Sequence, residues 1–559
     1  MEYGFMCHSV LRVTVSSMVA LMLSSSLLFG QTTGRAADQS GLVRQLSMDE
    51  AVRLALENNL GIRSDRLGPQ IEDVAVSQAR SLWAPNLTTG LTNVSQNTPA
   101  TSVFAGGQTK VTDARLTTQL GVSQSLPTGT IYSLGWNGGR ATSTNFFNTF
   151  DPQLTSNLSF NITQPLLRNL KFDTVRQQVA TSYKDREAAD WQLRSTTALT
   201  VRNVRNAYWD LAYQIDNLKA QQQSLDLSKR LLADNEKRVQ IGTMAPIDIV
   251  EAQSEVARNE EVVITAEAAI KQAEDRLRTL IFAPETPDFW TMSIEPSDGL
   301  SFQQQTVDVE GAVRRALASR TDVQLAKTSL ERSDINIKYF RNQVLPEINA
   351  QATYTSNAVG GVLLTPLTSF PVASAVSRGI LSERGFGSVL GDVLSNAYPT
   401  WTVGINVSYP IGTSTAEANL ARARLQVAQA EAQMKNLELQ VTAQVRDVAR
   451  QVQTNRKRID SAGASRQLAE RRLEAEEKKF AAGIQISFFV FQAQRDLAQA
   501  RTVEIRALSD YNKSLVDFEA VQETSLAGPT SLTSAGAGAI IPVPTSAAAP
   551  GGVTSASQR

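Results

Sequence analysis

The sequence has 559 residues, and its 54 lysine and arginine residues balance its 54 aspartate and glutamate residues. This balance argues against a basic surface of the kind that binds nucleic acid. The single cysteine and the single histidine, Cys7 and His8, both lie near the N-terminus, so the rest of the chain has no thiol or imidazole for catalysis or for zinc. We therefore expect no enzyme activity, no cofactor and no metal.

The N-terminus has the pattern of a secretory signal peptide. Arg12 precedes an apolar and serine-rich run from Val13 to Phe29, and small residues follow. We expect cleavage between Gly30 and Asp38, so residues 1–37 would be removed. The remaining sequence has no run of about 18 apolar residues, which argues against a transmembrane helix. A membrane location would then require β-strands.

An amphipathic helical segment opens the remaining chain. Ser47 is the expected N-cap, Glu50 follows three residues later, and Pro85 ends the helical pattern. The hydrophobic period then changes to alternation, which predicts strands with one apolar and one polar face. These segments are Leu87–Ser95, Leu116–Val122, Tyr132–Trp136 and Leu158–Ile162, with a tight turn at Pro127–Gly129. The alternation suits transmembrane barrel strands and also a β-sandwich.

A very long helix is expected from about Val175 to Val239, because no proline or glycine lies between Leu170 and Gly242. Its apolar residues recur three and four positions apart, which is the heptad pattern of a coiled coil. At about 1.5 Å per residue it would be about 100 Å long. Such a helix fits a solvated rod or the wall of a hollow structure. A turn then leads to a returning helix from about Ile247 to Ile281.

The second half repeats the order of the first. The sequence AVRLALENN from Ala51 corresponds to AVRRALASR from Ala312, and Pro85 corresponds to Pro346 at the same spacing. The expected strands of this half lie at about 347–410, with a glycine- and serine-rich loop from Ser356 to Ala397 between them. The mixture of Leu, Val and Phe in this loop predicts a partly ordered excursion and not a plain linker. A second long helical hairpin is expected at about 416–521.

These patterns divide the chain into two units and a tail. The first unit, 38–305, has strands at about 87–164, a helical hairpin at about 171–281 and a proline-containing connector to residue 305. The second unit is 306–526. Residues 527–559 consist of Ala, Gly, Pro, Ser and Thr with few other residues, so a disordered tail is expected.

Two tandem helix-strand-strand-helix units behind a signal peptide, prolines at the strand-to-helix junctions (Pro165 and Pro410) and glycines at both hairpin tips resemble TolC-family outer membrane efflux proteins. The resemblance covers about Leu46 to Leu526. It implies an α+β membrane protein, a homotrimer that shares one outer-membrane β-barrel and a long periplasmic α-helical (coiled-coil) barrel. It also implies a passive channel-tunnel that exports solutes to the exterior, as the outer component of a tripartite efflux or type I secretion system. The implied partners are a periplasmic adaptor, an inner-membrane pump and outer membrane lipid.

The first half departs from the family pattern in its strands. Four alternating segments occur around the turn at Pro127–Gly129, where family members commonly supply two strands. The extra hairpin either adds two strands to the barrel wall, giving six per protomer instead of four, or folds outside the wall.

The resemblance places a periplasmic gate at the two hairpin tips. An acidic gate position carries over onto Asp248, with Glu251 beside it, whereas the family's paired acids in the second tip fall on Phe489 and Gln492. An acidic ring is therefore in doubt, and we expect instead a hydrophobic gate that closes by packing and dewetting. The alternative is that the phenylalanines only hold the tip in the seam between helices. The gate candidates are Asp248, Glu251, Phe488, Phe489, Phe491 and Gln492.

Adaptor docking is expected at the exposed turns of both tips. The candidates are Arg238, Gly242, Thr243, Lys479 and Gly483. The glycines supply the backbone freedom of a helix-ending turn, so simple C-caps are the alternative interpretation. A different class of protein, a secreted coiled-coil structural or adhesive protein with a β head, would not need helices that twice leave and return to membrane-length strands.

Overall fold

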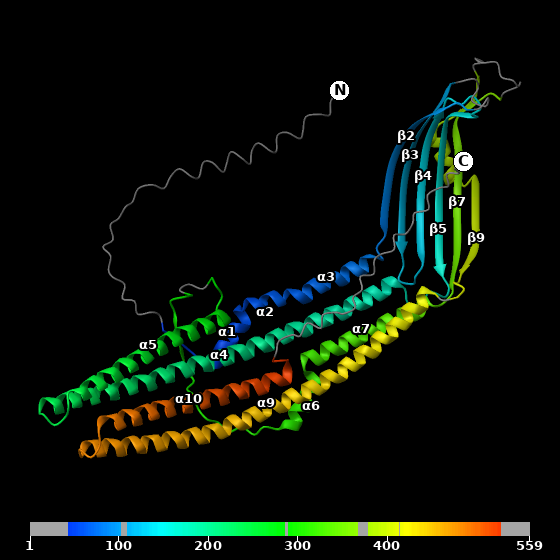
Figure 1. Ribbon diagram of the computed structural model, residues 1–559. Coiled ribbons are helices and arrows are strands. Elements are labelled where there is room, and N and C mark those ends of the chain that lie inside the picture. The colour runs from blue at the N-terminus through cyan, green and yellow to red at the C-terminus, as the bar shows by residue number, and fades with distance from the viewer. Residues whose placement is uncertain (1–42, 102–108, 286–288, 367–377, 413, 527–559) are drawn as a thin grey trace, which may run out of the picture.

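The computed structural model describes residues 43–101, 109–285, 289–366, 378–412 and 414–526. It has a long helical part and, at one end, a sheet that meets the helices at an angle (Figure 1). The expected signal peptide and the expected C-terminal tail lie outside the described residues. Within those residues, no helix combines the length and the apolar character needed to cross a bilayer.

Seven strands form one antiparallel sheet in the order β2-β3-β4-β5-β7-β8, and β9 also pairs with β7. Their bounds are β2 Asn86–Pro99, β3 Lys110–Ser125, β4 Ile131–Ser143, β5 Phe150–Pro165, β7 Glu347–Leu364, β8 Ile380–Arg384 and β9 Tyr398–Ser408. The four alternating segments of the first half are therefore all strands. The extra hairpin, β3 and β4, lies inside the sheet and not beside it.

The register gives the sheet one apolar and one polar face. Directly opposed residues of antiparallel strands share a face. One row runs across the sheet through Leu134, Phe160, Tyr354 and Trp401. A row of the other face runs through Gln119, Asn137, Asn157 and Asn357. The amide of Asn137 donates to the side-chain oxygen of Asn157 at 3.0 Å, so the polar row is partly internally bonded.

The stretch from Ser356 to Ala397 is partly ordered, as its mixture of Leu, Val and Phe predicted, and its residues 367–377 lie outside the described residues. β7 continues to Leu364, and the short strand β8 is followed by a helix, α8 (Phe386–Leu394). The sequence analysis did not predict the elements themselves. The Val389 and Val393 side chains of α8 are buried against the sheet, which is a tertiary contact that local composition does not reveal.

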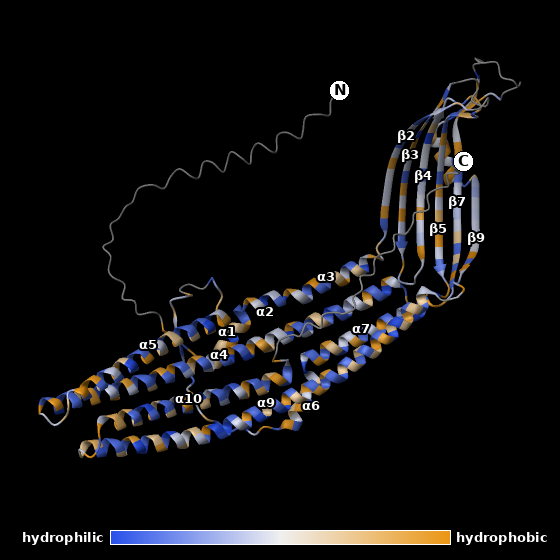
Figure 2. Ribbon diagram, in the orientation of Figure 1, coloured by the Kyte–Doolittle hydropathy of each residue, from blue (hydrophilic) through white to orange (hydrophobic). Residues whose placement is uncertain are grey.

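Two helices of equal length form the body of the helical part. α4 runs Thr174–Gln240 and α9 runs Thr415–Ala481, and the sequence predicted the bounds of α4 within a residue. Each begins with a side-chain cap. The Asp173 carboxylate accepts a hydrogen bond from the Arg176 amide, and the Ser414 hydroxyl accepts one from the Glu417 amide. Hydrophilic and hydrophobic residues alternate along both helices (Figure 2). This pattern agrees with a narrow apolar seam on an otherwise solvated helix.

The remaining helices pack beside these two. They are α1 Met48–Asn58, α2 Leu60–Asp65, α3 Leu67–Ser81, α5 Ile247–Ile281, α6 Val309–Ser319, α7 Thr321–Gln343 and α10 Ser487–Glu523. Near the sheet the neighbours run α3-α4-α7-α9, and further from it they run α5-α4-α10-α9. Both layers are therefore four helices wide and share α4 and α9.

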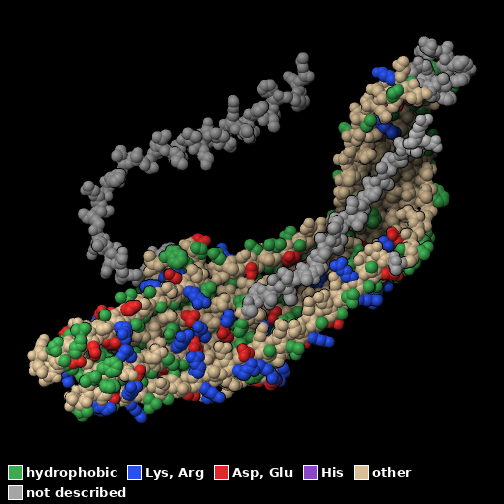
Figure 3. Space-filling model, viewed as in Figure 1, with side chains coloured by type: hydrophobic (Ala, Val, Ile, Leu, Met, Phe, Trp, Pro, Cys, Tyr) green, Lys and Arg blue, Asp and Glu red, His purple; other side chains and the backbone are tan. Residues whose placement is uncertain are grey.

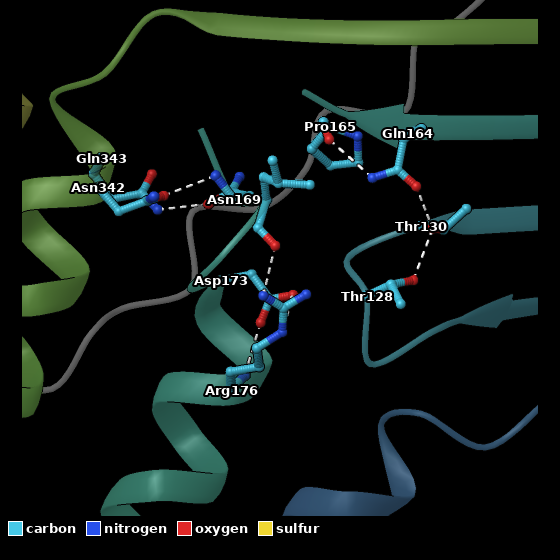
Figure 4. Close-up of polar contacts among 10 residues, drawn as sticks. Thr128, Thr130, Gln164, Pro165, Asn169, Asp173, Arg176, Asn342 and Gln343 are labelled. Atoms are coloured by element: carbon cyan, nitrogen blue, oxygen red, sulfur yellow. Dashed lines mark hydrogen bonds and ion pairs between the residues drawn. The ribbon is translucent and has the colours of Figure 1, made fainter. Parts of the chain in front are cut away.

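Polar contacts fix the junction between the sheet and α4 (Figure 4). The Asn169 amide donates to the side-chain oxygen of Asn342 at 2.7 Å, and Gln343 donates to the side-chain oxygen of Asn169 at 2.7 Å. Gly129, in the turn between β3 and β4, has a φ of +86°, and a Cβ there would lie 2.8 Å from the Asn169 carbonyl oxygen. The turn therefore needs glycine both for its backbone and for its fit against the junction.

A small two-stranded sheet lies against the middle of the helices. β1 (Val43–Leu46) pairs in parallel with β6 (Ser293–Pro296), which lies in the proline-containing connector and was not predicted as a strand. The Tyr208 hydroxyl on α4 donates to the Leu46 carbonyl at 3.0 Å and lies 3.0 Å from both the carboxylate and the amide of Asp298. Burial raises the pKa of Tyr208 to about 12, so it remains a neutral donor.

Tyr208→Phe should lower the free energy of unfolding by about 1 to 3 kcal/mol, because it leaves buried partners of the hydroxyl unsatisfied. Urea unfolding followed by circular dichroism measures the loss, and hydrogen exchange should place it at β1 and β6. Tyr213→Phe is the matched control, since the Tyr213 hydroxyl has no hydrogen-bond partner among the described residues and its loss should cost little. Equal effects of the two changes would contradict the role of Tyr208.

Candidate functional site at the hairpin tips

The two helical hairpins turn at the end of the molecule furthest from the sheet (Figure 1). α4 leads into α5 through residues 241–246, and α9 leads into α10 through residues 482–486. The α4 and α10 helices pack against each other, so the two tips form one unit. All sequence-predicted gate and docking residues lie in this region.

Both long helices end in the same hydrogen-bonded turn. After α4, the Thr243 amide donates to the Arg238 carbonyl at 2.9 Å and the Gly242 amide donates to the Val239 carbonyl at 3.0 Å. After α9, the corresponding bonds run from Ile484 to Lys479 and from Gly483 to Phe480. This is the Schellman motif, in which the residue after the cap has a positive φ.

The two tip glycines satisfy the geometric demand of that motif. Gly242 has a φ of +77° and Gly483 a φ of +75°, and a Cβ at either would meet nothing within 4 Å. The glycines are thus required for conformation and not for close packing. The C-cap interpretation accounts for both of them, and a docking role for either stays a prediction.

The three other docking candidates already have partners within the tips. The Arg238 guanidinium lies 4.4 Å from the centre of the Phe480 ring and donates to the Phe480 carbonyl at 3.4 Å. Lys479 pairs with Glu476 at 2.9 Å. The Thr243 hydroxyl donates back to the Arg238 carbonyl at 3.0 Å. Arg238 therefore connects the first hairpin to the second.

The three phenylalanines of the second tip divide into two environments. Phe491 is 3% exposed and belongs to an apolar cluster with Leu231, Leu473 and Phe480. Phe488 and Phe489 are exposed and meet edge to face at 5.6 Å. Phe491 thus holds the tip in the seam between helices, as the alternative interpretation had it. Phe488 and Phe489 lie on the surface of the single chain, and a gate role for them stays a prediction.

The acidic candidates lie at the start of α5. Asp248 is half-buried in the first turn and Glu251 is exposed, and neither has an ion-pair partner among the described residues. The buried acid of this region is Glu255, one turn later, which lies 3.9 Å from Arg495 on α10 and 3.6 Å from Arg258. Sequence reasoning missed this pair, because only the packing of α5 near α10 brings it together.

Buried polar groups without partners gather in the same seam. Asn235 on α4 is fully buried, and neither its amide nitrogen nor its oxygen has a hydrogen-bond partner among the described residues. The Ser487 hydroxyl and the Gln494 oxygen on α10 are likewise buried and unpartnered within those residues. Gln492 is half-buried. Such groups lower the stability of the closed seam, and sequence reasoning had not singled them out.

The tips also expose aliphatic side chains that the sequence analysis did not select. Figure 3 shows hydrophobic side chains at this end of the molecule, among charged ones. The exposed aliphatic residues are Ile241, Ile247, Val250, Ile484 and Ile486. They flank the tip turns, where a contiguous apolar surface is typical of a protein interface. No group of acidic or other side chains in the described part of the chain is arranged to hold a metal ion.

Solved structures share this fold over most of its length. The chain is similar to the CmeC outer membrane channel of Campylobacter jejuni, with 15% identity, 85% of each chain covered and a TM-score of 0.57. It is similar to the outer membrane protein VceC of Vibrio cholerae, with 14% identity over 85% of this chain and 96% of that chain and a TM-score of 0.57. A membrane protein from Pseudomonas aeruginosa matches at 17% identity, 88% and 96% coverage and a TM-score of 0.61.

The fold is therefore that of outer membrane channel proteins. No curated protein sequence matches the chain. The model of the outer membrane efflux protein family matches residues 51–281 and 312–521, and the chain belongs to this family. The expected class, an efflux protein of the outer membrane, is confirmed.

Proposed function

We propose that copies of this chain close into a trimeric ring that forms a passive channel-tunnel, with the sheets making a shared barrel in the outer membrane and the helices a tunnel in the periplasm. The observation that carries this proposal is the pair of unfilled edges on the single chain. One edge consists of β2, α3 and, further from the sheet, α5. The other edge consists of β9 and α9 (Figure 1).

Exposed apolar side chains line both edges. On α3 they form a stripe at positions i, i+4 and i+7, Leu67, Ile71 and Val74. On α9, Leu425 and Leu439 are exposed and lie two heptads apart. Because α3 and α9 flank the same layer of four helices, one copy can place its α3 stripe on the α9 stripe of the next. Contacts between two different edges close into a ring when the rotation permits.

The sheet supports the same arrangement. β2 and β9 are edge strands with exposed apolar residues, such as Leu91 and Val403. An open edge in lipid leaves backbone groups without partners, and pairing β2 of one copy with β9 of the next removes it. The polar row through Asn137 and Asn157 would then line a water-filled lumen, and the apolar row would face lipid. Each copy contributes the six long strands β2, β3, β4, β5, β7 and β9.

The same proposal includes an ancestral duplication and two protein partners. The two units, 38–305 and 306–526, are supported by the two segments that match the family model and by the two Schellman turns of the same geometry.

A periplasmic adaptor would dock on the exposed aliphatic residues and turns of the tips, and an inner-membrane pump would supply the energy. The protein would serve a tripartite efflux system or a type I secretion system, with the pump selecting the cargo.

The mass of the protein in detergent tests the ring. Light scattering after size exclusion should give three chain masses, and the assembly should resist SDS until it is heated. Leu425→Asp should dissociate it, because a charge would enter the contact between helices. Ile484→Asp, an equally exposed site at the tip, should leave the trimer intact. A water-soluble monomer without detergent would refute the proposal.

Within the ring, we propose that Phe488 and Phe489 form the hydrophobic gate. Phe489→Ala should raise single-channel conductance in planar bilayers, because a smaller side chain widens and wets the constriction. Phe302→Ala removes a ring of the same exposure (40%) far from the tips and should leave conductance unchanged. Unchanged conductance of the Phe489→Ala protein would reject the gate role of this residue.

A further inference from the structure

The edge strand of the sheet is interrupted by a helix. β8 and β9 both run antiparallel to β7, and both lie on the edge of β7 that β5 does not occupy. On β7 their pairing ends at Asn357 and resumes at Gly361, whereas residues 385–397 of the returning chain separate them. β8 and β9 are therefore two parts of one returning strand, and α8 is inserted between them.

α8 packs tightly on one face of the sheet. Its Val389 and Val393 side chains form a cluster with Ala358, Leu154 and Leu158. The Ser356 hydroxyl donates to the Val393 carbonyl at 2.8 Å. A Cβ at Gly360 would lie 2.5 Å from the Val389 side chain, so the strand is shaped to receive the helix. α8 therefore packs closely and specifically on the sheet.

The face that α8 covers is the apolar one. Trp136, Leu158 and Ser356 are directly opposed across three strands, and Trp136 meets Phe386 of α8 at 6.4 Å between ring centres. The polar row through Asn137, Asn157 and Asn357 points to the opposite side. In the proposed barrel, on which this inference rests, α8 consequently lies on the outer wall and not in the lumen.

We propose that α8 and β8 are a membrane-contact element, whose free side binds the acyl chains and headgroup boundary of the outer leaflet. The residues that carry it are Leu394 at the end of α8 and Ile380 on β8, each more than 60% exposed. Ile380 is directly opposite Leu364, which belongs to the apolar face. A short helix with one apolar surface in contact with lipid lies in the plane of the interface. The element lies at the end of the strands furthest from the periplasmic helices, which is the level of the outer leaflet (Figure 1).

The position of α8 excludes a second copy of the chain as its partner. α8 lies over β5 and β7, and Phe386 reaches Trp136 on β4, so it covers the interior of the sheet. A neighbouring copy would meet the sheet at β2 and at the opposite edge, which β8 and β9 form, and not on the face that α8 covers. Two exposed charged residues, Arg140 and Glu383, lie on the same face beside α8, as expected at a boundary between acyl chains and headgroups.

Nitroxide labelling of the full-length protein in liposomes of outer-membrane lipids tests the proposal. Cys7 is the only cysteine, so a Cys7→Ser background accepts one label at a time. A label introduced by Leu394→Cys should be several-fold more accessible to oxygen, which partitions into lipid, than to a water-soluble nickel chelate. Asn357→Cys on the polar face should give the reverse ratio, and Val403→Cys on the apolar face should report lipid.

The three sites separate the possible results. If position 403 reports lipid and position 394 reports water, α8 does not contact the membrane and the inference is wrong. If position 403 reports water, the proposed barrel is wrong, and the inference that rests on it is wrong as well. Dipolar broadening between labels at position 394 would indicate a contact between copies and would also overturn the inference.

Discussion

Phe491→Ala should be among the most damaging single changes at the hairpin tips, with a loss of about 3 to 5 kcal/mol in local stability. Phe491 is 3% exposed and fills the cluster formed with Leu231 and Phe480, so truncation leaves a cavity between α4, α9 and α10. Hydrogen exchange should accelerate over residues 473–497 of the tip, and the channel should open more often in planar bilayers.

Phe488→Ala is the matched control for this change. Phe488 lies only three residues away but is 45% exposed, so its removal creates no cavity. Its effect on hydrogen exchange should be small, within about 0.5 kcal/mol, as for other surface substitutions. Equal protection of the tips in both variants would show that the Phe491 cluster does not hold them together.

Asn235→Leu should act in the opposite direction and stabilise the closed tips, by about 1 to 3 kcal/mol. Asn235 is fully buried with both polar atoms unpartnered among the described residues, so the native side chain is desolvated without compensation. Leucine has the same branched shape, with as many side-chain heavy atoms, and has no polar group to leave unpaired. Slower hydrogen exchange at the end of α4 and a lower open probability in bilayers would follow.

Asn455→Leu provides the comparison on α9. Asn455 is also buried, but its amide donates to the Asp510 carbonyl at 3.1 Å and its oxygen accepts from Arg458 at 3.5 Å. The same substitution should therefore destabilise the protein at this position. A loss of stability at both positions would show that Asn235 is satisfied in solution.

Long regular elements could be predicted from the sequence because their causes are local. The bounds of α4 follow from the glycine- and proline-free stretch between Leu170 and Gly242, and the strands follow from their alternation. Gly242 and Gly483 were located for the same reason, since glycine commonly ends a helix by taking a positive φ. Local rules thus fixed the positions of the tips.

The features that were missed depend on contacts between distant segments. β6 exists only because Val43–Leu46 pairs with it, and α8 forms on a surface that β5 and β7 provide. Phe491 is buried and Phe489 is exposed because only one face of α10 meets α4. Their identical side chains give no sign of this difference in the sequence. The pair of Glu255 and Arg495 likewise needs α5 and α10 to be neighbours.

The hairpin β3–β4 has a consequence for the bore of the assembled channel. Strands spaced about 4.8 Å apart and tilted by about 40° each span about 6 Å of circumference, so the six long strands of one copy span about 37 Å. Four helices packed at about 9 to 10 Å span nearly the same perimeter. Without that hairpin the sheet would be about a third narrower than the helices beneath it. In the proposed ring, its presence would let the passage keep one calibre along both the sheets and the helices, and the proposed gate at the tips would be the narrowest point.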